Sequence, residues 1–287
     1  MTELDNLFDN KNTQTGNEFS KEEWIKQKIE SREEAYVMLE IATEELDNPD
    51  SVMAYLDIQS RFDRYSVSNS LLIAYQNPDA TKICDSKTWQ KNNVRINKGE
   101  KGIVILEPGK PYTRDDGRTI TPYNAKKVFD ISQTNAAQRT PRTKMPDARV
   151  VIKALIRTSP VPVEISSQLP KETKAIYQPG AKKIFIKQGL DGDEIFRALS
   201  KEIAFAKLDN GSFNRHNLEF TAQAVSYIAT SRVGYIPEPI TAVSDKFLSL
   251  EVKDKRSELA VIRENANSIS HTINKALESM NKEHTER

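Results

Sequence analysis

The sequence predicts an α+β fold, and two local patterns carry that prediction. Apolar residues recur at three- and four-residue spacing over long stretches near both ends of the chain, which is typical of amphipathic helices. Between these stretches lie short runs rich in β-branched residues, such as 103–106 and 183–186, which are typical of strands. A length of 287 residues exceeds that of most single domains, so we expect two domains.

The expected organisation follows changes in composition along the chain. Residues 1–20 are polar and are expected to form a flexible tail, followed by a mixed helix and strand domain over residues 21–134. Residues 135–148 offer almost nothing to bury and form the expected linker. A second α+β domain is expected over residues 149–240, and a charged C-terminal helix over residues 241–287. That helix is expected to pack on its own domain, with a partner-binding or dimer helix as the alternative.

These segments divide further into individual elements. Helices are expected over residues 20–47, 51–64, 68–76, 193–207, 214–232 and 244–279. Strands are expected over residues 101–106, 127–131, 162–165, 175–178 and 183–186. Asp115-Asp116-Gly117 predicts a turn, and Pro179-Gly180 predicts a hairpin between the last two strands. Residues 150–156 are apolar and receive no assignment.

The composition narrows the class of protein. It is 37% hydrophobic and 29% charged, with a mean hydropathy of -0.62, as in globular proteins with a polar surface. No run approaches the roughly 18 apolar residues of a membrane span, and the first thirty residues do not resemble a signal peptide. We therefore expect a cytoplasmic protein with no membrane partner. The single Cys84 excludes an internal disulfide and a cysteine-rich metal site.

Charge is unevenly distributed along the chain. The net charge of +1 conceals a segment, residues 81–150, in which 15 Lys and Arg stand against 7 Asp and Glu. Residues 1–50 are the opposite, with 5 basic residues against 14 acidic ones. A basic block in a nearly neutral chain concentrates positive potential on one surface and indicates a polyanionic partner.

Aromatic and cationic residues interleave within that basic block. They are Lys82, Trp89, Lys91, Arg95, Lys98, Lys101, Tyr112, Arg114, Arg118, Tyr123, Lys126, Lys127 and Phe129. Single-stranded nucleic acid is bound by this mixture, because cations neutralise phosphates and aromatic faces stack on unpaired bases. The alternative is that Trp89, Tyr123 and Phe129 are core residues of a small sheet whose edges are solvated by lysines.

Five blocks in one order carry a resemblance that goes beyond composition. The blocks are Tyr65–Leu72, Pro78–Thr81, Thr88–Lys91, Asn97–Ile103 and Val128–Thr134. Together they resemble the N-terminal domain of the ArdC antirestriction family over about residues 50–134, and LtrC-like proteins of Gram-positive mobile elements resemble the rest more loosely. The resemblance implies a module that binds single-stranded DNA, in a protein of plasmids and conjugative elements that protects incoming DNA from restriction.

The same resemblance implies where DNA is contacted. The implied contacts are Arg61, Tyr65, Asn69, Trp89, Lys91, Arg95, Lys98 and Lys101. For Trp89 the match fits a core residue as well as a stacking one, so both roles stay open. Around Gly99 the chemistry is sensible, since glycines let the backbone approach a phosphate while the flanking lysines supply charge.

ArdC-like proteins continue into a zincin-like metallopeptidase domain, and two stretches of this chain, 196–206 and 219–227, resemble its ligand-bearing helices. In that family a His-Glu-x-x-His helix supplies two zinc ligands and a general base, and a later helix supplies a third ligand. Here Lys201 and Phe205 stand at the two histidines and Gln223 at the third ligand, and only Glu202 remains. We therefore expect a degenerate zincin-like domain with no cofactor and no catalysis.

The resulting expectation is a DNA-binding accessory protein of a mobile element whose second domain is a non-catalytic scaffold or partner surface. Single-stranded DNA is the expected partner, and restriction or conjugation proteins are further candidates. One rival is a metal-dependent hydrolase in which His216 and Glu219 join Glu202 around a displaced ion. Another is a protein-interaction factor in conjugation or replication that no longer binds DNA.

Overall fold

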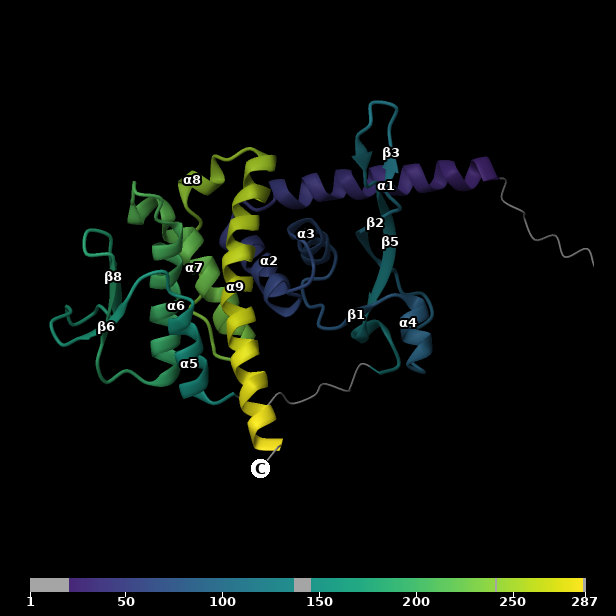
Figure 1. Cartoon of the computed structure of the whole chain (residues 1–287). Coiled ribbons are helices and arrows are strands. Elements are labelled where there is room, and N and C mark those ends of the chain that lie inside the picture. The colour runs from purple at the N-terminus through teal and green to yellow at the C-terminus, as the bar shows by residue number, and fades with distance from the viewer. Residues whose placement is uncertain (1–20, 137–145, 241, 286–287) are drawn as a thin grey trace, which may run out of the picture.

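A computed structural model describes residues 21–136, 146–240 and 242–285 of the chain (Figure 1). The helices are α1 (Lys21–Glu44), α2 (Pro49–Arg61), α3 (Val67–Gln76), α4 (Ser86–Lys91), α5 (Ala148–Arg157), α6 (Gly192–Leu208), α7 (Arg215–Arg232), α8 (Asp245–Leu248), α9 (Val252–Thr285) and the 3-10 turn η2 (Ile131–Gln133). The strands are β1 (Ile83–Cys84), β2 (Ile103–Pro108), β3 (Tyr112–Thr113), β4 (Thr119–Ile120), β5 (Tyr123–Asp130), β6 (Val163–Ser166), β7 (Ala175–Gln178) and β8 (Lys183–Lys187).

The α+β class and the long elements expected from the sequence are confirmed. The unassigned apolar stretch forms α5, and the expected last helix is interrupted at residues 249–251, so that it forms α8 and α9. The short elements β1, α4, β3 and β4 were missed, because two to six residues carry too little periodicity to detect. The expected tail, 1–20, and most of the expected linker, 137–145, lie outside the described residues.

The first sheet has the order β1-β5-β2 and is antiparallel throughout. Ile103, Ile105 and Val128 from this sheet pack with Ile58 of α2 and Ile73 of α3 in a small apolar cluster. The β2–β5 ribbon continues outward into the two-stranded β3–β4 hairpin, which protrudes beside α1 in Figure 1. The Asp115-Asp116-Gly117 turn lies at its tip, as expected.

Two side-chain amides of α3 cover the free edge of β2. Asn69 donates to the Leu106 carbonyl at 2.9 Å and accepts from the Leu106 N–H at 2.8 Å. Gln76, seven residues and two helical turns later, makes the same pair of bonds with Val104, at 2.9 Å each. A helix thus takes the place of a neighbouring strand, which satisfies backbone groups that an exposed edge leaves open.

The second sheet has the order β6-β8-β7, with β6 parallel and β7 antiparallel to the central β8. The Pro179-Gly180 turn joins β7 and β8, as expected. Helix α6 packs on this sheet and pairs with α7, and α5 and α9 lie against the helical side. Figure 1 shows α9 standing between the two sheets.

The apolar interiors of the two halves are joined. One cluster of buried side chains takes residues from α1, α2 and α3 as well as from α5, α6, α7 and α9. Polar bonds cross the same junction: the Tyr227 hydroxyl donates to Asp57 at 2.7 Å, and Arg232 donates to the carbonyls of Gln59 and Ser60. The expected division into two domains stays a prediction.

Helix α9 fills its apolar face within this junction. Leu259, Ile262, Ala266, Ile269 and Ile273 are buried at the three- and four-residue spacing of one helix face. The helix packs against α5 and α7 and also touches α1 and α3. Among the described residues, none of the helices has the length and apolarity needed to cross a membrane.

Candidate functional site

The chain that follows α4 is a loop held in place by backbone bonds. The Asp85 side chain caps α4 by accepting from the Thr88 N–H at 2.7 Å. After the helix, residue 96 forms a β-bridge with Thr134, and Asn135 bonds to Arg95 through both its backbone N–H and its side-chain oxygen. Gly99 has a φ of +90°, a conformation that favours glycine and reverses the chain before β2. The loop is therefore a fixed platform.

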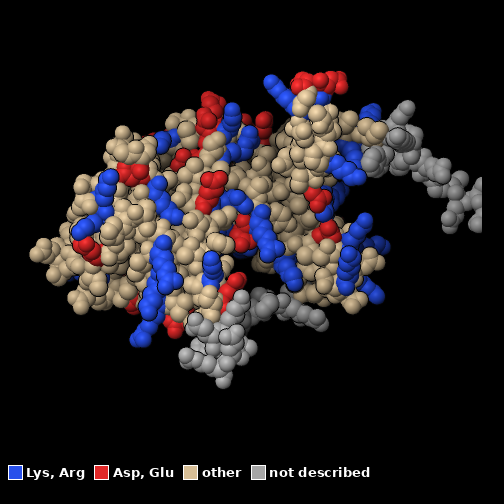
Figure 2. Space-filling view, viewed as in Figure 1, with Lys and Arg blue, Asp and Glu red and all other residues tan. Residues whose placement is uncertain are grey.

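Four predicted contact residues gather on this platform, and we call them the α4-loop cluster: Lys91, Arg95, Lys98 and Lys101. All four are exposed. None of their charged groups takes part in an ion pair or a hydrogen bond within the described parts of the chain. Figure 2 shows basic side chains concentrated over the region of α4. Their charge is available to an external anion.

Arg61 and Tyr65 lie at the α2–α3 turn and already have partners. The Arg61 guanidinium donates to the carbonyls of Pro78 and Ala80 at 2.8 and 3.2 Å and pairs with Asp57 at 3.6 Å. The Tyr65 ring packs edge-on against Phe62, and burial raises the pKa of its phenol. Arg61 thus holds the turn after α3, and Tyr65 is half-buried.

Two predicted DNA contacts are buried instead. Asn69 is 9% exposed, and its amide is fully used in covering the edge of β2. Trp89 is 2% exposed, and its indole N–H donates to the Phe129 carbonyl at 2.9 Å. A buried ring offers no face to a base, so Trp89 is a core residue in this structure and neither side chain is presented at the surface. A contribution of either residue to DNA binding stays a prediction. Their position in the blocks that resemble the ArdC family is explained by these structural roles.

The Val128–Thr134 block also has a structural explanation. Asp130 is 1% exposed and accepts from the backbone N–H groups of Thr81, Lys82 and Ser132. Burial raises the pKa of Asp130, but these hydrogen bonds outweigh it, so the pKa is held below its usual range. The carboxylate joins the end of β5, the start of β1 and η2.

Exposed rings in the basic block are tyrosines that lie on the β-ribbon. Tyr112 on β3 is 48% exposed and Tyr123 on β5 is 44% exposed. Lys110, Arg114 and Arg118 lie on the same ribbon and are also exposed. The sequence pattern included both tyrosines but gave no sign of which rings are buried, and the resemblance drew attention to Trp89 instead.

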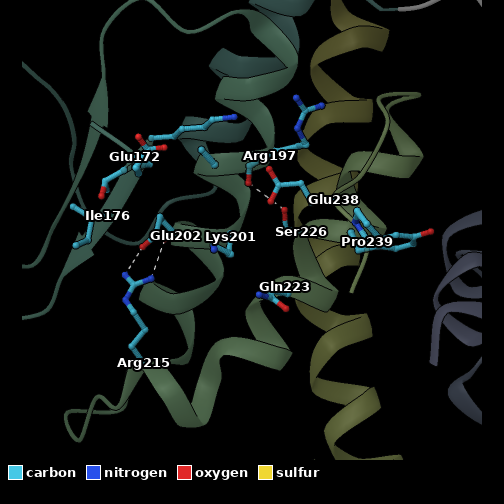
Figure 3. Close-up of a pocket in the computed structure, with 15 residues that line it drawn as sticks. Glu172, Ile176, Arg197, Lys201, Glu202, Arg215, Gln223, Ser226, Glu238 and Pro239 are labelled. Atoms are coloured by element: carbon cyan, nitrogen blue, oxygen red, sulfur yellow. Dashed lines mark hydrogen bonds and ion pairs between the residues drawn. The ribbon is translucent and has the colours of Figure 1, made fainter. Parts of the chain in front are cut away.

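The second half contains a cleft of about 430 Å³ between β7, α6 and α7 (Figure 3). Glu202 of α6 lies in its wall and is only 2% exposed. Its carboxylate accepts from the Tyr177 N–H of β7 at 2.6 Å and from both terminal nitrogens of Arg215 at 2.6 and 3.0 Å. Burial lowers the pKa of Arg215, but its bonds to Glu202 outweigh burial, so the pKa is raised. The bonds to Glu202 therefore favour the charged form of Arg215.

The other degenerate positions surround this pair. Phe205 is fully buried, and the Arg215 guanidinium lies 4.2 Å from the centre of its ring. The Lys201 ammonium and the Gln223 amide both donate to one oxygen of Glu219, at 3.2 and 2.9 Å. Figure 3 shows Lys201 and Gln223 on neighbouring helices beside the cleft.

These residues do not fit a divalent metal ion. Lysine and phenylalanine supply no ligand, and the single remaining carboxylate of the motif is bonded to Arg215. A second cation, Lys201, lines the same cleft and pairs with Glu219, and cations repel a dication. His216 is exposed and Glu219 binds Lys201, so the structure does not assemble the alternative set with Glu202. Across the described parts of the chain, no cluster of at least three His, Cys, Asp or Glu residues is arranged to hold a metal.

Known proteins share this architecture at low sequence identity. No family model matches the sequence. An uncharacterized protein of Bacillus anthracis is 24% identical in an alignment that covers 89% of this chain and 53% of that protein. The chain thus spans about half the length of the curated relative it matches.

Solved structures place the fold in a recognisable class of mixed α+β proteins. A metal-free crystal structure of the antirestriction protein ArdC from the R388 plasmid has a TM-score of 0.50 at 15% identity and covers 74% of this chain and 86% of that one. Its Mn(II)-bound structure has a TM-score of 0.52 at 14% identity and covers 77% and 91%. At such identities the likeness shows a shared fold, so the expectation of an ArdC-like architecture is confirmed.

Proposed function

We propose that this chain binds single-stranded DNA as an antirestriction-type accessory protein of a plasmid or conjugative element, and that its second half does not hydrolyse peptides. The observation that carries the first part is the α4-loop cluster. Its four cations lie at the end of α4 and on the following loop, which is fixed by backbone bonds, and they are exposed and unpaired within the described residues. Phosphates are therefore bound without first breaking ion pairs among those residues.

The fold likeness supports the biological setting. The neighbouring ArdC structures are of an antirestriction protein from a plasmid. Single-stranded DNA rather than duplex is favoured because the exposed rings of Tyr112 and Tyr123 lie on the same ribbon as three exposed cations, Lys110, Arg114 and Arg118, at the end away from the α4-loop cluster. Rings stack only on unpaired bases. In this proposal Tyr112 and Tyr123 take the stacking role first considered for Trp89.

The non-catalytic part of the proposal rests on the cleft. One neighbouring structure contains Mn(II), whereas here Lys201, Phe205 and Gln223 leave Glu202 as the only carboxylate of the motif. Without a metal, a carboxylate bonded to an arginine has no water to activate. Metal analysis of the purified protein tests this directly. Stoichiometric zinc or manganese retained through dialysis would contradict it.

Fluorescence polarisation with labelled oligonucleotides tests DNA binding. The intact chain is expected to bind single strands of unrelated sequence with similar affinity, to bind duplex more weakly, and to lose affinity steeply as salt is raised. The cluster variant Lys98→Ala with Lys101→Ala is expected to bind more weakly. Its matched control is Lys153→Ala with Lys275→Ala, which removes two exposed lysines from the other half and is expected to change the affinity little. Indifference to single strands at low salt would refute the proposal.

A second pair of variants separates stacking from charge. Tyr112→Leu with Tyr123→Leu removes the rings but keeps apolar volume, and is expected to weaken binding by about 1 to 3 kcal/mol for each base that no longer stacks. The dependence on salt should stay unchanged, because tyrosine carries no charge to a phosphate. An unchanged affinity would exclude the ribbon from the interface.

The antirestriction part is tested in cells. Transfer of an unmodified plasmid into a restricting host is expected to rise when the intact chain is expressed. The increase should be lost with the cluster variant Lys98→Ala with Lys101→Ala. A rise that the variant preserves would separate antirestriction from DNA binding.

A further inference from the structure

One cation of the second half has no counterpart in the motif that the sequence resembles. Arg215 is the first residue of α7, directly after the helix cap Asn214. Its side chain reaches back to α6 and is 34% exposed, whereas the Glu202 carboxylate that it meets is 3% exposed. The contact is bidentate, with nitrogen to oxygen distances of 2.6 and 3.0 Å, which is the strongest arrangement that arginine and a carboxylate form.

Aromatic rings hold the same guanidinium from another side. It lies 4.2 Å from the ring centre of Phe205 and 6.0 Å from that of Phe213, and these two rings are themselves packed edge to face. Phe205 stands where the resemblance implies the second histidine ligand. At this position the face of its ring contacts the Arg215 guanidinium instead of a metal.

The arginine also reaches the edge of the sheet. Tyr177 of β7 donates its N–H to Glu202 at 2.6 Å, and its carbonyl lies 3.5 Å from an Arg215 nitrogen. Carboxylate, guanidinium and edge strand therefore form one closed set of bonds. Each buried charge has a partner within the protein, as burial of charge requires.

We propose that Arg215 is a permanent internal replacement for the metal of this cleft. This inference rests on the proposed loss of metal-dependent catalysis. The guanidinium neutralises Glu202, positions the edge of β7 and repels any dication. One cation of the protein then takes the place of a bound one, which leaves the cleft ordered without metal.

Restoring the ligands tests this replacement. Lys201→His with Phe205→His and Gln223→Glu rebuilds the family pattern while Arg215 stays, and the quadruple variant adds Arg215→Ala. In equilibrium dialysis with zinc chloride, the quadruple variant is expected to hold about one zinc per chain, at least about tenfold more tightly than the triple variant. Equal affinity of the two variants would overturn the proposal.

A double-mutant cycle tests the pairing of Arg215 with Glu202 that the proposal requires, even if the rebuilt variants fail to fold. Arg215→Ala and Glu202→Ala are each expected to destabilise the intact chain in urea. Their combination should destabilise it less than the sum, with a coupling of at least about tenfold in the folding equilibrium. Additive effects would show that the two groups do not replace a cation site together. Zinc retained by the unaltered chain would instead contradict the proposed function.

Discussion

The α4-loop cluster and the Arg215 site use the same kind of side chain in opposite ways. In the cluster, four cations are exposed and have no internal partner within the described residues. In the cleft, one guanidinium is surrounded by a buried carboxylate and two rings, and its charge is neutralised within the protein. The difference teaches that the number of basic residues in a segment says less about anion binding than their pairing does.

The largest expected effect on stability comes from the buried Arg215 site. Arg215→Ala leaves Glu202 buried without its cation, so we expect the free energy of unfolding to fall by about 3 to 5 kcal/mol. Lys201→Ala removes a half-exposed pair with Glu219 and is the control, with an expected loss below about 1 kcal/mol. Urea unfolding measures both. Similar losses for the two variants would mean that burial does not distinguish them.

Substitution of Trp89 tests whether a buried ring of α4 supports the α4-loop cluster. Trp89→Ala removes a 2% exposed ring on the buried side of α4, so we expect a loss of about 3 to 5 kcal/mol in stability. Trp89→Phe keeps most of the packing and loses only the bond to the Phe129 carbonyl, which costs about 1 kcal/mol. DNA affinity of the folded Phe variant should be unchanged. A specific loss of affinity there would restore the stacking role.

The variant Lys98→Ala with Lys101→Ala tests the role of the exposed α4-loop cluster. Because these lysines have no ion-pair partner within the described residues, stability should stay within about 0.5 kcal/mol of the original. Binding to oligonucleotides of all sequences should weaken, and the steepness of its salt dependence should fall by about 0.7 for each phosphate that is no longer neutralised. Polarisation titrations at several salt concentrations measure this. An unchanged slope would place the phosphates elsewhere.

The smallest expected effect concerns Asp85, which lies at the start of α4. Hydrogen bonds from Thr88, together with Lys126 at 3.1 Å, lower the pKa of Asp85 to about 2. Because the pKa of Asp85 is lower in the folded chain than in the unfolded chain, its charged form stabilises the fold. This stabilisation is fully present above about pH 4 and is lost as the pH falls through about 2. Asp85→Asn keeps a good helix cap but removes the charge, so we expect a loss of about 0.5 to 1 kcal/mol at neutral pH. The loss should disappear near pH 2. Urea unfolding across this pH range measures it.

Local pattern was enough to predict most elements and the location of the basic block. Helices α2, α3, α6 and α7 and strands β7 and β8 were found within a few residues, because their apolar spacing and turn residues are local properties of the chain. The residues that stand at the ligand positions implied by the resemblance, Lys201, Phe205 and Gln223, are read directly from the sequence, but the resemblance to a metal-binding motif stays a prediction.

Two of the predicted contacts, Asn69 and Trp89, are buried for a physical reason that the sequence does not carry. Asn69 and Trp89 look like interface residues by type, but a polar amide and an indole also serve buried edges and cores. Whether a side chain faces water depends on what packs over it. In this chain those neighbours, Leu106 and Phe129, lie 37 and 40 residues away.

The sequence by itself determined the α+β class and the charge of each segment, since both follow from residue identity and short-range spacing. The loss of metal ligands follows only from the resemblance and stays a prediction. Only the tertiary structure decided which basic side chains of the described residues are exposed without an ion-pair partner and which are bonded to a carboxylate of the protein. Arg215 meets Glu202 across 13 residues, and Tyr227 meets Asp57 across 170. Such partners are chosen by packing, and packing joins residues whose distance along the chain carries no signal.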